Sequence, residues 1–240
     1  MTTVRLLPET DLARIALLSD EEKRIQLRRV KYGKPPYSFA PLRKAVPGLF
    51  NARKSLFELP ACTIRDIEAA IRKDCHGFKE WIEPNIVLAR ILFGFNVNRG
   101  LIAVEREFNA VPFGFGAKLK LWHDFYTVQD ERPVVCFIDP RLRDGLTTLG
   151  RRFVFSAMYH NLAVADFSDV TFEILRFPKA KNSGERLIQV HKFSPSEVVS
   201  EREINEAIDK TYKMWVEVLA EREQEATRNP PTGTGGLFGF

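Results

Sequence analysis

The run Val134-Val135-Cys136-Phe137-Ile138 constrains the fold more than any other part of the chain, because its apolar residues do not alternate with polar ones. A strand with one solvated face alternates apolar and polar side chains, whereas a strand covered on both faces is apolar throughout. Pro133 and Asp139 bound the run. We therefore predict a central strand over 133–139 in a sheet with protein packed on both sides.

Helical and strand periodicities alternate around this strand. A helix from the Thr63 cap should end at His76-Gly77, a buried helix should run over 84–97, and a third over 146–164 should cross the sheet. Further strands are predicted at 101–108, 118–128, 170–177 and 186–193. The polar link 129–133 should pair two strands as a hairpin. These patterns predict an α+β fold with a mixed αβββαβ core sheet and burial of Val134, Phe137, Ile138, Phe153, Ala157 and Ile174.

The two flanks of this core carry opposite charge. Residues 1–60 contain 12 Lys/Arg and 6 Asp/Glu, and residues 195–225 contain 4 and 9. A capping box at Ser19 starts the second helix of an N-terminal helical hairpin, and an amphipathic helix starts at Ser196 or Ser200. Residues 33–60, with five prolines, are predicted as a loop. The predicted divisions are a basic helical and loop extension (1–60), the α/β core (61–194), a C-terminal helix (195–226) and a disordered tail (227–240).

The basic helix over 21–31 is a candidate site for DNA or another polyanion. Its cations fall within about three helical turns and would bind phosphates by displacing counterions. The residues concerned are Lys23, Arg24, Arg28, Arg29 and Lys31. The acidic C-terminal helix would repel such a ligand, and the two oppositely charged ends can equally attract each other. The sequence leaves both alternatives open.

The cellular compartment of the protein and the state of its cysteines are predicted from features that the sequence lacks. No apolar run approaches the roughly 18 residues of a membrane helix, and the first residues do not form the apolar stretch of a signal peptide. The three cysteines are odd in number and lack the close pairs of a zinc site. We expect a cytoplasmic protein with reduced structural thiols and no membrane partner.

The predicted order of elements over about 80–178 resembles the αβββαβ core of the PD-(D/E)XK nuclease superfamily. The resemblance implies that an acid on the second strand and an acid-x-lysine pair on the third hold Mg²⁺ and activate water. The matching positions here are Asp124, Asp139 and Arg141. Glu83 is the nearest match to a further family acid on the first helix, and Glu105 is an alternative. Two carboxylates would supply oxygen ligands of the kind that Mg²⁺ prefers.

Arg141 departs from the lysine of that pattern. A guanidinium stays protonated, so it can stabilise charge but cannot serve as a base. Asp139 can instead end a strand in a turn, with Arg141 paired to it or to Asp144. Two functions follow from the sequence. The first is a nuclease-like protein that binds or cleaves DNA, a magnesium-dependent endonuclease with Asp124 and Asp139 as ligands. The alternative is a noncatalytic interaction protein that keeps this fold and holds a protein partner through its charged helices.

Overall fold

A five-stranded mixed sheet lies at the centre of the computed structural model, which describes residues 6–30, 38–52, 62–113 and 117–228. The strands lie in the order β1-β4-β5-β6-β7, with β5 and β6 parallel and the other neighbours antiparallel. A second, two-stranded sheet pairs β2 with β3. The α+β class is therefore confirmed. The strands are β1 (Ile102–Glu105), β2 (Val111–Phe113), β3 (Ala117–Leu119), β4 (Phe125–Gln129), β5 (Arg132–Asp139), β6 (Thr171–Arg176) and β7 (Gln189–Lys192).

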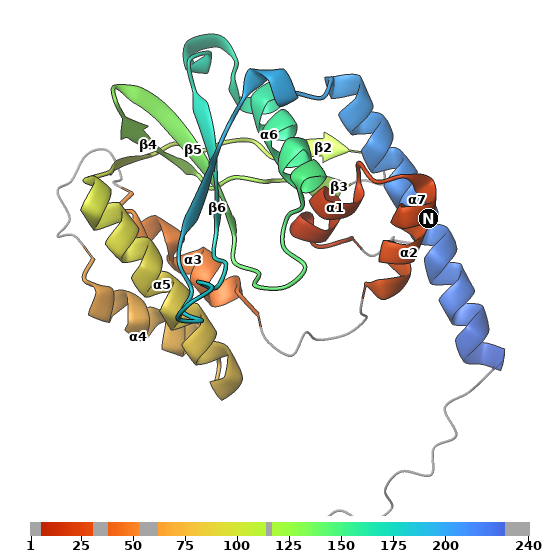
Figure 1. Cartoon of the computed structure of the whole chain (residues 1–240), viewed down its shortest axis with the longest axis horizontal. Coiled ribbons are helices and arrows are strands. Elements are labelled where there is room, and N and C mark those ends of the chain that lie inside the picture. Colours follow the sequence, from red (N-terminus) through yellow and green to blue (C-terminus); the bar gives the residue numbers. More distant parts are fainter. Residues whose placement is uncertain (1–5, 31–37, 53–61, 114–116, 229–240) are drawn as a thin grey trace, which may run out of the picture.

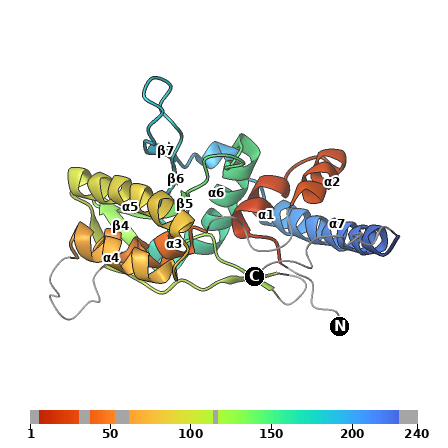
Figure 2. The ribbon, with the colours of Figure 1, turned by 90° about the horizontal axis from the view of Figure 1, so that it is seen from below.

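Helices cover both faces of the main sheet, as the apolar central strand requires (Figures 1 and 2). Val135 and Phe137 of β5 pack into a cluster with one set of helices, and Cys136 and Ile138 pack into a second cluster on the other face. The first set is α1 (Glu9–Ile15), α2 (Asp20–Arg29), α6 (Thr148–Leu162) and α7 (Glu201–Arg228). The second is α3 (Ala40–Leu49), α4 (Ile64–Asp74) and α5 (Lys79–Arg99). All six residues predicted for the core are buried.

Local sequence signals fix several boundaries. Capping boxes at Ser19 and Thr63 start α2 and α4, and Ser200 exchanges the same pair of hydrogen bonds with Glu203 at the start of α7. Asp130 and Glu131 form the two-residue turn between β4 and β5, both with positive φ, at 49° and 64°. This turn gives the predicted β4–β5 hairpin, and α6 makes the predicted crossover to β6.

Two predicted segments were wrong, and a third is shorter than predicted. Residues 40–49 form α3 rather than a loop, because Pro41 occupies the first turn, where a missing N–H removes no helical bond. The predicted strand over 118–128 is two strands, since β3 ends at Leu119 and β4 begins at Phe125. The predicted strand over 101–108 pairs with β4 only from Ile102 to Glu105. Residues 33–37 and 53–60 of the predicted loop lie outside the described residues, as does most of the predicted tail.

The N-terminal helices belong to the main core rather than to a separate extension. Leu12 and Ile15 of α1 and Leu27 of α2 are at most 1% exposed and share a cluster with the sheet. All three cysteines are free thiols, with Cys75 and Cys136 buried and Cys62 exposed. Burial raises the pKa of the Cys136 thiol. Among the described helices, none is both long and apolar enough to cross a membrane.

Candidate functional site

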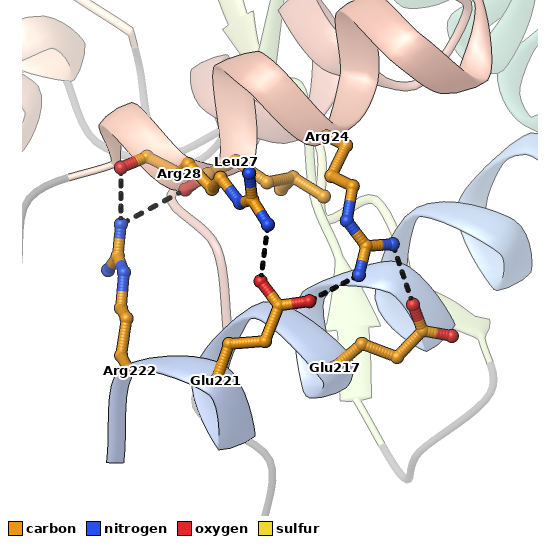
Figure 3. A network of polar contacts seen from close by, with 6 residues as sticks. All are labelled: Arg24, Leu27, Arg28, Glu217, Glu221 and Arg222. Atoms are coloured by element: carbon orange, nitrogen blue, oxygen red, sulfur yellow. Dashed lines mark hydrogen bonds and ion pairs between the residues drawn. The ribbon is translucent and has the colours of Figure 1, made fainter. Parts of the chain in front are cut away.

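The basic helix α2 lies against the acidic helix α7 and pairs with it through charged side chains (Figure 3). Arg24 Nη1 donates to Glu217 Oε2 at 2.9 Å, and Arg24 Nη2 donates to Glu221 Oε1. Arg28 Nη2 donates to the second oxygen of Glu221 at 2.8 Å. One carboxylate thus bridges two guanidinium groups one helical turn apart.

The same helix pair is joined at both ends. Lys210 Nζ lies 2.8 Å from Asp20 Oδ2 at the start of α2. At the other end, Arg222 Nη2 donates to the carbonyl oxygens of Leu27, at 3.3 Å, and Arg28, at 2.7 Å (Figure 3). The last carbonyls of a helix have no partner within it, so Arg222 satisfies two acceptors that would otherwise depend on water.

Lys23 points into the protein instead of toward solvent. Lys23 is 2% exposed. Its Nζ donates a hydrogen bond of 3.0 Å to the carbonyl oxygen of Ala16, the residue that follows α1. Burial lowers the pKa of this ammonium, and the nearby Asp20 carboxylate opposes that shift. Lys23 therefore ties α2 to the end of α1.

The predicted polyanion surface is thus largely occupied by contacts within the protein. Lys23, Arg24 and Arg28 bind other parts of the chain, and Arg29 is exposed without an ion pair to any described residue. Lys31 lies outside the described residues. The alternative that the oppositely charged ends attract each other is confirmed. The partners Glu217, Glu221 and Arg222 were not singled out from sequence, although the charge asymmetry between the two ends indicated their region.

Asp139, predicted as a metal ligand, is a completely buried carboxylate at the end of β5. Its Oδ2 accepts from the backbone N–H of Leu146 at 2.7 Å and lies 3.4 Å from Arg176 Nε, and its Oδ1 accepts from Arg141 N at 3.3 Å. Gly145 lies so close that an added Cβ would come within 2.8 Å of Oδ2 and 2.6 Å of Arg176 Nη2. Protein donors therefore surround this carboxylate, which holds the loop between β5 and α6.

Arg141, the position that matches the lysine of the nuclease pattern, instead forms a two-pronged ion pair with Asp11 of α1. Its Nη2 donates to Asp11 Oδ2 at 3.1 Å, and its Nη1 donates to Oδ1. Partial burial acts to lower the pKa of Arg141, but the hydrogen bond and charge of Asp11 raise it above its usual value. Asp144, a candidate partner from sequence, pairs with Arg14 at 3.0 Å instead.

Asp124 lies in the loop before β4 and is half exposed. It accepts from Phe108 N at 2.9 Å and from Lys120 Nζ at 2.6 Å. Partial burial acts to raise its pKa, yet these two hydrogen bonds hold it below the usual value. Glu83 and Glu105 are exposed on α5 and β1. Within the described ranges, His, Cys, Asp and Glu side chains form no group of three suited to a metal ion. The candidate acids Asp124 and Asp139 are thus each held by donors of the protein itself.

Comparison with known proteins finds similarity that extends over almost the entire chain. Residues 10–225 match the model of a protein family described as "Sliding clamp-binding bacterial toxin SocB". A relative named "DNA replication inhibitor toxin SocB", from Caulobacter vibrioides (strain NA1000 / CB15N), is 32% identical over 234 residues. That alignment covers 97% of this chain and 96% of the relative. No solved structure matches.

Proposed function

Because the chain belongs to the SocB family of sliding clamp-binding bacterial toxins, we propose that it binds a bacterial DNA sliding clamp and thereby inhibits DNA replication. The observation that carries this proposal is the extent of the similarity. It includes both faces of the sheet and reaches from α1 to the last turns of α7, rather than one short motif. A bacterial toxin with this target would act in the cytoplasm, where the replisome assembles.

We infer a noncatalytic mode of action, in which binding itself blocks replication. The family description names a protein partner and no reaction. The geometry of the predicted nuclease residues supports this choice, because Asp139 and Arg141 bind Arg176 and Asp11 inside the protein. Asp124 is held by Lys120. The interaction-protein alternative from the sequence therefore accounts better for these contacts than the nuclease does.

A binding measurement tests the proposal directly. Purified sliding clamp from C. vibrioides, immobilised for biolayer interferometry, should bind this chain with a Kd of about 1 μM or tighter, the range of a specific complex. A chain ending at Arg228 shows whether residues 229–240 are needed for binding. No binding at concentrations about a hundredfold higher would contradict the proposal.

A replication assay separates clamp binding from DNA binding. Primer extension by a clamp-dependent polymerase should stop when this chain is added, whereas extension by a polymerase that works without a clamp should continue. Equal inhibition of both polymerases would point to the DNA template as the target. A supercoiled plasmid incubated with the chain and Mg²⁺ should stay intact. Nicking that requires Mg²⁺ and that Asp124→Asn abolishes would favour the nuclease instead.

A further inference from the structure

A cleft opens where four distant segments of the chain meet. Its volume is about 260 Å³, and it lies between the N-terminal segment with α1, helix α3, strand β3 and helix α7. The side chains of Leu6, Leu7, Pro8, Leu12, Leu119 and Tyr212 line it, together with Glu9, Arg43 and Lys118. Leu7, Leu12, Leu119 and Tyr212 belong to the core, so the floor is fixed by packing.

The walls of the cleft differ in chemistry. Leu6 is 47% exposed, which leaves an apolar side chain at the mouth beside the buried leucines. Arg43 and Lys118 supply two exposed cations from α3 and β3. Lys118 has no ion pair with any residue that the structure describes. An apolar floor beside two cations, of which Lys118 has no ion pair to a described residue, fits a ligand that combines an apolar group with a negative charge.

Glu9 neutralises only part of this charge. Its Oε2 lies 3.6 Å from Arg43 Nη1, beyond hydrogen-bond distance. Burial raises the pKa of the Glu9 carboxyl, and Arg43 and Lys120 oppose that shift. The Arg43 guanidinium has five N–H donors, and its side chain makes no hydrogen bond to another described residue. A carboxylate from outside would therefore find free donors.

The size of the cleft selects the class of ligand. Sites for drug-sized molecules usually have volumes of about 300–1,000 Å³ and enclose most of the ligand. This cleft lies at the lower edge of that range, and its lining residues Leu6, Arg43 and Lys118 are exposed, so it is open rather than enclosing. Room for one or two side chains with an open mouth suits an anchor residue of another protein, of the kind that dominates the energy of an interface.

We propose that this cleft docks an extended segment of a partner protein in which a carboxylate stands next to a large apolar side chain. The apolar side chain enters between Leu6, Leu12 and Leu119. The carboxylate binds Arg43 and Lys118. This proposal goes beyond clamp binding. It does not depend on clamp binding, because it rests only on the side chains that line the cleft.

A peptide-display selection tests the proposal on the full chain without any clamp, so that peptide capture and clamp binding succeed or fail separately. Random ten-residue peptides selected on the wild-type protein should be enriched for Asp or Glu beside Leu, Phe or Trp. Fluorescence anisotropy with the most enriched peptide then compares variants. Arg43→Gln with Lys118→Gln, and separately Leu6→Ser, should each weaken its binding at least about tenfold.

Matched controls keep the outcome clear. Lys73→Gln with Lys79→Gln removes two exposed cations from α4 and α5 and should leave peptide affinity unchanged. Melting curves confirm that each variant folds. The proposal is overturned if no peptide is enriched, if the enriched peptides lack this acidic and apolar pair, or if the cleft variants bind like the wild type. Binding that develops only after deletion of residues 1–5 would also overturn it, because the chain itself would then fill the cleft.

Discussion

Asp139 shows how one residue type at a strand end supports two opposite interpretations. An acid followed two residues later by a cation is the pattern of a metal-dependent nuclease and also of a buried ion pair. The sequence does not contain the deciding information, because Arg176 and Leu146 reach Asp139 only through the parallel pairing of β5 with β6 and the fold of the following loop. Asp11, which forms the ion pair with Arg141, lies 130 residues from it in sequence.

We predict that Asp139→Asn lowers the free energy of unfolding by about 3–5 kcal/mol, because removing one partner of a buried ion pair leaves the other charge uncompensated. Urea denaturation measures the change. Asp124→Asn is the matched control, since that carboxylate is 47% exposed and should matter much less. Equal effects of the two substitutions would show that Asp139 has no special structural role.

His123 makes the stability depend on pH. Burial lowers the pKa of its imidazole to about 4, and the positive charges of Arg43 and Lys120 act in the same direction against Asp124. Between pH 6.5 and 4 the unfolded chain binds a proton that the folded protein resists, so stability is full above pH 6.5 and falls as the pH decreases through this window. His123→Phe should flatten the slope of melting temperature against pH.

Phe153 tests the packing of α6 on the sheet. It is 0% exposed within the first cluster, so Phe153→Ala should cost about 3–5 kcal/mol through lost contacts and a residual cavity. Leu149→Ala, one turn earlier on α6 and 38% exposed, should cost far less in the same urea titration. A melting temperature that Phe153→Ala leaves unaltered would argue against this arrangement of helix and sheet.

At the scale of elements, the helices and strands that are marked by a short stretch of sequence were predictable. The caps at Ser19 and Thr63, the β4–β5 hairpin and the α6 crossover all follow from short stretches of sequence. Segments fixed by distant contacts were not. Helix α3 forms despite its prolines because Leu42, Val46 and Leu49 are completely buried, and β3 leaves the main sheet to pair with β2. Tertiary packing outweighs local propensity at both places.

The helix pair α2–α7 provides a prediction at this scale. Arg24→Ala with Arg28→Ala should lower the melting temperature, because Glu217 and Glu221 lose their partners, and added salt should reduce the difference from wild type. Affinity for a labelled DNA duplex should stay the same. Arg29→Ala removes an exposed cation without an ion pair to a described residue and serves as the control. If the double variant lost DNA affinity while its melting temperature stayed the same, the hypothesis that α2 binds polyanions would be supported instead.

At the scale of the whole molecule, the predicted division at residue 60 does not match the packing. The helices of 9–29 complete the cluster on one face of the sheet, and α3 contributes to the cluster on the other face. Polar contacts follow the same pattern, since Asp11 binds Arg141 and α2 binds α7. The sequence showed the amphipathic character of these helices. It did not show which surface they cover, because that depends on contacts between the two ends of the chain.

This packing predicts that the N-terminal helices are required for folding. Deleting residues 1–30 would remove Leu12, Ile15 and Leu27 from the core and expose the opposing surfaces of α6 and α7 to water. Each such side chain contributes about 1.5–3 kcal/mol when buried, and a domain has only about 5–15 kcal/mol in total. The deletion should therefore abolish the cooperative melting transition and the near-ultraviolet circular dichroism of the buried aromatic residues. Removal of residues 229–240, which their composition predicts to be disordered, is the control and should preserve both signals. A deleted chain that still melts cooperatively would show that the rest of the chain folds without the N-terminal helices.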